Sequence, residues 1–102
     1  MFVVTNTIKV KEGAGKELAE RFAEGQGVQE MPGFMRLEVW HGVNKEQEEL
    51  KVCTLWENEQ SFRNWTSSDA FRAAHQGRGK NEAILGASLD TYELIVQVSA
   101  EE

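Results

Sequence analysis

The sequence predicts an α+β fold in which helices cover one side of a four-stranded antiparallel sheet. Three observations predict it: a strand-like alternation near the start, amphipathic helical spacing after it, and a later pair of short helical segments that precedes a last strand. With 102 residues the chain can build one modest core but not two, so residues 1–102 are expected to form a single domain.

The first half of the chain begins with a predicted strand over residues 2–10. Its apolar positions alternate and share one face: Phe2, Val4, Ile8 and Val10. Gly13-Ala14-Gly15 ends this strand, and residues 16–24 then show helical spacing of Leu18, Ala19, Phe22 and Ala23. Gly25-Gln26-Gly27 is expected to stop the helix, and Met31-Pro32-Gly33 to form a turn.

The second half begins with a predicted hairpin, whose strands span about 34–41 and 49–56 and flank a polar loop at 42–48. Asn58 or Glu57 is expected to start a helix that carries Phe62 and Trp65. This helix is interrupted at Thr66-Ser67-Ser68-Asp69, whose hydroxyls can cap a second helix through Phe71, Ala74 and His75. The second helix is expected to end at Gly77-Arg78-Gly79. A loop to about residue 87 leads to a last strand at 89–98. This order, βαββαβ, is the ferredoxin-like pattern.

Composition excludes several classes of function. Eleven basic against seventeen acidic residues give a net charge of −6, which argues against nucleic acid or an anionic membrane as a partner. Cys53 is the one cysteine, so an intrachain disulfide or a thiolate cluster cannot form. The first residues lack the pattern of a signal peptide, and no apolar run reaches the length of a membrane span, so a cytoplasmic location is expected.

Three residues depart from a plain core pattern. Asn6 lies between Val4 and Ile8 on the apolar face of the first strand, where an amide must find partners; it is either a structural residue or part of a site. His75 follows Phe71 by four residues at a helix end, beside a glycine-rich loop suited to a bulky ligand, so it is either a core histidine or a metal ligand. Trp65 is by composition either core or pocket wall.

Other chemistries have weak support. His41 is expected to be a solvated residue at a strand end, and two histidines so far apart do not form a zinc motif. Cys53 lies between apolar and β-branched neighbours, a setting typical of an inert sheet thiol. Gly13 and Gly15 lack the context of a phosphate-binding loop.

The three unusual residues all fall within a resemblance to one known protein family. Residues 55–65 (LWENEQSFRNW) and 68–75 (SDAFRAAH) resemble the central segment of the IsdG-type haem-degrading monooxygenases, and Asn6, Arg21-Phe22 and Gly33-Phe34 fall at matching places. The resemblance covers nearly the whole chain. The wider antibiotic biosynthesis monooxygenase superfamily shares the fold and the Phe-x-x-Trp pattern, but usually not all three polar positions.

The resemblance implies a ferredoxin-like domain that dimerises through its sheets into an α+β barrel, with one haem pocket per subunit. Haem is then both substrate and oxygen activator. With O₂ and an external electron donor, the enzyme opens the porphyrin and releases iron and an open-chain tetrapyrrole. The implied catalytic residues are Asn6, Trp65 and His75.

Each implied residue has a physical role. His75 would ligate the haem iron through a neutral imidazole, and Asn6 would donate its amide hydrogen to iron-bound dioxygen. Trp65 would press its ring into the macrocycle and distort it, and Phe22 would line the haem pocket. One departure is Gly25-Gln26-Gly27, which stands where relatives have basic residues, so the resemblance does not give the propionate contacts; Arg72, Arg78 and Lys80 are the candidates for them.

Two alternatives stay open at this point. One is a cofactor-free monooxygenase of the same superfamily that acts on a quinol or phenol, against which the Asn, Trp and His positions argue. The other is a haem-binding domain without turnover, which an activity assay distinguishes. A homodimer is expected in each case, because helices on one side leave sheet surface to cover.

Overall fold

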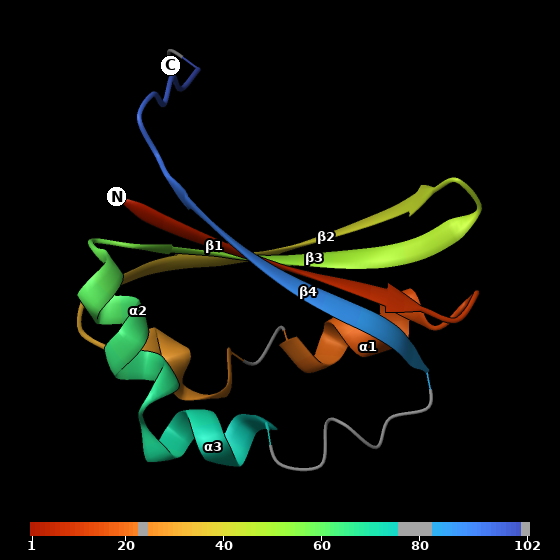
Figure 1. The fold of residues 1–102 in the computed structure, drawn as a ribbon, viewed down its shortest axis with the longest axis horizontal. Coiled ribbons are helices and arrows are strands. Elements are labelled where there is room, and N and C mark those ends of the chain that lie inside the picture. Colours follow the sequence, from red (N-terminus) through yellow and green to blue (C-terminus); the bar gives the residue numbers. More distant parts are fainter. Residues whose placement is uncertain (23–24, 76–82, 101–102) are drawn as a thin grey trace.

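The computed structural model describes residues 1–22, 25–75 and 83–100. In chain order its elements are β1 (Phe2–Val10), α1 (Gly15–Phe22), the 3₁₀ helix η1 (Gly25–Glu30), β2 (Phe34–Asn44), β3 (Gln47–Trp56), α2 (Glu59–Thr66), α3 (Asp69–His75) and β4 (Ile84–Glu93). The strands form one antiparallel sheet in the order β2-β3-β1-β4, and the helices lie together on one side of it (Figure 1). The predicted ferredoxin-like α+β fold is confirmed.

The register of β1 fixes which residues face the helices. Val4 pairs with Thr54 and Ile8 pairs with Leu50 of β3, and directly paired residues point to the same side of a sheet. Val4, Ile8 and Leu50 are almost fully buried, so this side is the one that the helices cover. Asn6 lies between them in the same alternation, as the sequence predicted.

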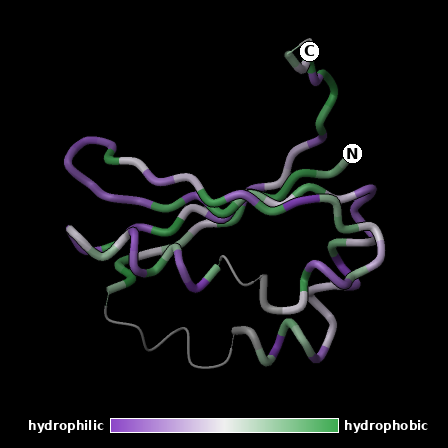
Figure 2. Tube along the Cα trace, turned by 180° about the vertical axis from the view of Figure 1, so that it is seen from behind, coloured by the Kyte–Doolittle hydropathy of each residue, from purple (hydrophilic) through white to green (hydrophobic). Residues whose placement is uncertain are grey.

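The β2–β3 hairpin is longer than predicted. The ladder continues to the pair Asn44 and Gln47, and only Lys45 and Glu46 form the turn, with positive φ values of 53° and 67°. Two positive values match a type I′ turn, whose twist suits a hairpin. The polar composition of residues 42–48 suggested a loop, but backbone pairing needs no apolar side chain, and the hydrophilic hairpin tip projects from the rest of the sheet (Figure 2).

The last strand was predicted wrongly by about five residues at each end. β4 runs from Ile84 to Glu93, whereas the alternation predicted 89–98. The reason is its partner: β1 begins at Phe2, which pairs with Glu93, and the last bond is from the Leu94 N–H to the Met1 carbonyl at 2.9 Å. The apolar residues that follow have no strand to pair with and extend away from the domain (Figure 1).

The helix boundaries follow the capping residues. Asn58 is the N-cap of α2, where its side chain accepts a hydrogen bond of 2.9 Å from the Ser61 N–H. Ser68 Oγ accepts one of 3.1 Å from the Phe71 N–H at the start of α3. The glycines at 25 and 27 open η1 instead of a plain loop, and the predicted stop at 77–79 lies outside the described residues. Within the described ranges no helix is long and apolar enough to cross a membrane.

Candidate functional site

The buried core is divided into two clusters. One contains Ile8, Val10, Leu18, Phe22, Leu50 and Val52. The other contains Val4, Val28, Trp56 and Trp65. On β1 the boundary between the clusters falls at Asn6, which follows Val4 and precedes Ile8. Leu37 of β2 packs against both clusters, so they are connected on the far side of Asn6 from β4.

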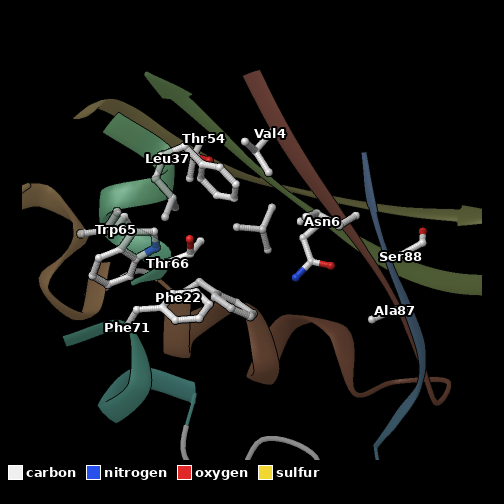
Figure 3. Close-up of a pocket in the computed structure, with 14 residues that line it drawn as sticks. Val4, Asn6, Phe22, Leu37, Thr54, Trp65, Thr66, Phe71, Ala87 and Ser88 are labelled. Carbon is white, nitrogen blue, oxygen red and sulfur yellow. The ribbon is translucent and has the colours of Figure 1, made fainter. Parts of the chain in front are cut away.

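A pocket of about 370 Å³ lies at this boundary, between the sheet and the helices (Figure 3). This volume is within the usual range for small-molecule and cofactor sites. The lining comes from all four strands and from every helix: Val4, Asn6, Phe22, Val28, Leu37, Val52, Thr54, Phe62, Trp65, Thr66, Phe71, Ala87, Ser88 and Leu89. Most of these side chains are apolar and none is charged, so the pocket suits a large apolar ligand.

Asn6 projects its side-chain amide into the pocket (Figure 3). The residue is half-buried, and its side chain makes no hydrogen bond to any other residue that the structure describes. An amide on an apolar wall is costly unless it is paired, so a structural asparagine would be expected to have a partner here. The geometry therefore favours a role for the Asn6 amide in ligand binding.

Trp65 and Phe22 form walls of the same pocket. The Trp65 side chain is buried at 7% exposure and packs edge-on against Phe71, with ring centroids 5.5 Å apart and an interplanar angle of 87°. Phe22 is buried at the end of α1. Trp65 thus belongs to the core and to the pocket at once, so the two interpretations of this residue are compatible. Three of the four predicted site residues, Asn6, Phe22 and Trp65, line one cavity.

His75 is the last residue of α3. Its side chain lies outside what the structure describes, so its predicted contact with a ligand stays a prediction. Phe71, four residues earlier in the same helix, lines the pocket, and positions four apart share a helix face. This spacing is consistent with the prediction.

His41 is exposed, as expected of a solvated residue, but it lies inside β2 rather than at a strand end and has a partner in Glu48. Its Nε2 lies 3.1 Å from Glu48 Oε2, and the Glu48 carboxylate also accepts hydrogen bonds of 2.7 Å from the Gly13 N–H and 2.7 Å from the Gly15 N–H. The Gly13 hydrogen bond, followed by that of His41, holds the pKa of Glu48 below its ordinary value. Glu48 therefore caps the N-terminus of α1, which has no capping side chain of its own.

The remaining candidates have no role in the pocket. Cys53 is a buried free thiol in the sheet, and burial raises its pKa, as expected of an inert cysteine. In the described ranges no three His, Cys, Asp or Glu side chains gather to hold a metal ion. Sequence reasoning missed the pocket residues Thr54, Ala87 and Ser88, since they stand in ordinary strand positions or in a segment predicted as a loop.

Comparisons with known proteins agree with this geometry. Residues 1–77 match the family model described as antibiotic biosynthesis monooxygenase. A staphylobilin-producing heme oxygenase from Staphylococcus haemolyticus is 45% identical over 84 residues, which are 81% of each chain. A heme-degrading monooxygenase from Halalkalibacterium halodurans is 43% identical over 94% of this chain and 84% of its own. The heme degrader MhuD from Mycobacterium tuberculosis, solved with two hemes in its active site, has a TM-score of 0.77 at 37% identity, over 97% of this chain and 100% of its own.

Proposed function

The chain belongs to the antibiotic biosynthesis monooxygenase family, and we propose that it is a haem-degrading monooxygenase that binds haem as its substrate. The observation that carries the proposal is the pocket between the sheet and the helices. A cavity with uncharged, mostly apolar walls receives one unpaired amide, from Asn6, at the point where the two clusters separate. The names of the relatives and the haem-bound MhuD structure support the same substrate.

The residues of the pocket fit a porphyrin. Its flat apolar macrocycle would lie between the sheet and the helices, with Phe22 and Trp65 as aromatic walls, and its two carboxylates would point to the open side, where no lining charge is needed. When bound, haem supplies the iron that activates dioxygen, and an external donor supplies the electrons.

We assign a separate task to each protein residue. His75, at the end of α3, would hold the iron through a neutral imidazole nitrogen, which the one-turn distance from the pocket residue Phe71 supports. Asn6 would donate its amide hydrogen to an oxygen atom above the macrocycle. Because β1 is a central strand of the sheet, bonded on both sides, this donor is fixed in place before the ligand arrives.

Trp65 would determine the shape of the bound macrocycle. Its ring is held on one side by Phe71 and is anchored in a buried cluster, so it cannot easily move away from a ligand. A rigid wall of this kind can bend a flat porphyrin out of plane, which is one of the ways in which a protein alters haem reactivity.

A haem titration followed by a turnover assay tests the proposal. The wild-type protein is expected to bind haem in near-stoichiometric amount with a Soret band, and to lose that band with reductant and oxygen in the presence of catalase, which removes bleaching by peroxide. Released iron and an open-chain tetrapyrrole should appear together. Failure to bind haem would favour a cofactor-free monooxygenase, and a Soret band that persisted would leave a haem-binding domain without turnover.

We also propose a homodimer joined through the sheet. The helices leave one side of the sheet uncovered (Figure 1). By the strand register this side carries Val3, Trp40, Leu55 and Tyr92, of which Trp40 is 53% and Tyr92 55% exposed. Large aromatic side chains on an uncovered sheet face are a common basis of subunit contact. Together with the small size of the domain, this face supports a dimer whose two sheets pack against each other.

A further inference from the structure

The three tryptophans of this chain differ in what their indole N–H groups contact. The Trp56 ring is fully buried, and its Nε1–H donates to Thr54 Oγ1 at 3.0 Å. Trp40, on the exposed face of the sheet, donates to Glu38 Oε1 at 3.0 Å. Trp65 is 93% buried, yet no acceptor for its indole N–H occurs among the described residues. A buried indole normally has a partner, so this donor requires an explanation.

The unpaired nitrogen of Trp65 borders the pocket. Within the described ranges no fully buried side-chain nitrogen or oxygen lacks a hydrogen-bond partner, so the Trp65 nitrogen must keep contact with open space. Figure 3 shows it on the cavity side of the indole ring. The donor thus faces the same cavity as the Asn6 amide, from the opposite wall.

We propose that the Trp65 indole N–H binds a neutral carbonyl oxygen of an oxygenated tetrapyrrole, and so recognises the product side of the reaction. This inference rests on the proposed function. Haem itself carries oxygen only in its two carboxylates, and burying a carboxylate beside a wall without a cation is costly. The lactam carbonyls formed when the ring opens are neutral acceptors, and they arise where the macrocycle lay.

Such a donor would act after oxygen insertion rather than before it. An interaction that is absent with the substrate and present with the oxygenated ring favours the forward reaction without tightening substrate binding. Trp65 would then have two separable functions: its ring shapes the macrocycle, and its N–H holds the oxygen that the reaction adds.

The test compares two ligands and two variants. Biliverdin carries two lactam carbonyls and two propionates, whereas metal-free protoporphyrin IX carries the propionates alone. Trp65→Phe keeps the aromatic wall and removes the N–H; Trp40→Phe removes an indole N–H outside the pocket. We expect Trp65→Phe to weaken biliverdin binding by roughly three- to tenfold more than protoporphyrin binding, because the smaller ring affects both ligands and the loss of one neutral hydrogen bond affects biliverdin alone. Trp40→Phe should change neither.

Hydrogen exchange of the indole N–H groups gives a second readout that needs no substitution. In the wild-type protein the Trp65 indole N–H should exchange more slowly with biliverdin bound than with protoporphyrin bound, while that of Trp56 is protected in both. Equal weakening of both ligands by Trp65→Phe, or equal protection in both complexes, would overturn the inference and leave the haem proposal intact. A wild-type protein that bound neither tetrapyrrole would overturn both.

Discussion

Replacing Asn6 by leucine should separate stability from activity. Leucine has nearly the same shape as asparagine but no polar atoms, and the flanking residues Val4 and Ile8 belong to the two buried clusters. Because the Asn6 side chain has no hydrogen-bond partner in the described part of the chain, the substitution removes no interaction from the ligand-free protein. It removes only the cost of holding an unpaired amide on an apolar wall.

The magnitude follows from the burial of Asn6. A fully buried unpaired polar group costs about 1–3 kcal/mol, and Asn6 is half-buried, so Asn6→Leu should raise the free energy of unfolding by about 1 kcal/mol. For a domain of this size that corresponds to a rise in Tm of roughly 4–8 °C. Loss of a donor positioned toward the reacting oxygen should slow haem degradation by roughly 100- to 1000-fold.

Thr54→Val is the matched control, because it makes the same kind of isosteric change on the neighbouring strand. Thr54 pairs with Val4, and its hydroxyl accepts the N–H of the fully buried Trp56. This substitution leaves a buried donor unpaired, so it should destabilise the protein by about 1–3 kcal/mol. Urea unfolding of both variants, with the Soret assay, tests the argument. If Asn6→Leu destabilised the fold as Thr54→Val does, Asn6 would be a structural residue.

Three further outcomes are expected. His75→Ala should still fold and lose the imidazole-ligated haem spectrum with turnover, whereas His41→Ala should keep both; similar spectra for the two variants would contradict the iron assignment. The pKa of Glu48 is lowered in the folded protein, so the stabilisation by its carboxylate should be full above the ordinary pKa of 4.5 and lost as the pH falls through the lowered value. The difference in free energy of unfolding between wild type and Glu48→Gln should therefore shrink in acid. A difference that did not depend on pH would argue against a charged cap. Wild type should sediment as a dimer at micromolar concentration and Trp40→Lys as a folded monomer; a monomeric wild type would remove the support for sheet packing.

Local patterns in the sequence were sufficient to predict most of the fold. The alternation in β1 and the caps Asn58 and Ser68 act over a few residues, so their effects can be read from neighbouring positions. The ends of β4 could not be predicted in this way. Ile95, Val96 and Val98 continue an apolar pattern, but they lie beyond the start of β1, and the strand ends where its partner does.

The candidate site was predictable where a residue contradicted its own surroundings. An amide on the apolar face of a strand identifies Asn6 without any structure, and the resemblance joined it to Trp65 and His75. Thr54 gives no such signal, because threonine is common in strands and only the register places it on the pocket side. The Glu48 cap lies 33 residues from Gly15, a distance in sequence at which no local rule applies.

Polar side chains outside the pocket have hydrogen-bond partners within the chain, whereas two polar side chains that face the pocket have none among the described residues. Trp56 and Glu48 have their partners within the chain, and each of these contacts fixes an element that supports the pocket. The Asn6 amide and the Trp65 indole N–H have no partner in the described part of the chain, and both face the same cavity. If they were merely imperfections of packing, there would be no reason for both to face the same space. Their convergence supports a binding site in which acceptor atoms of a ligand pair with both donors.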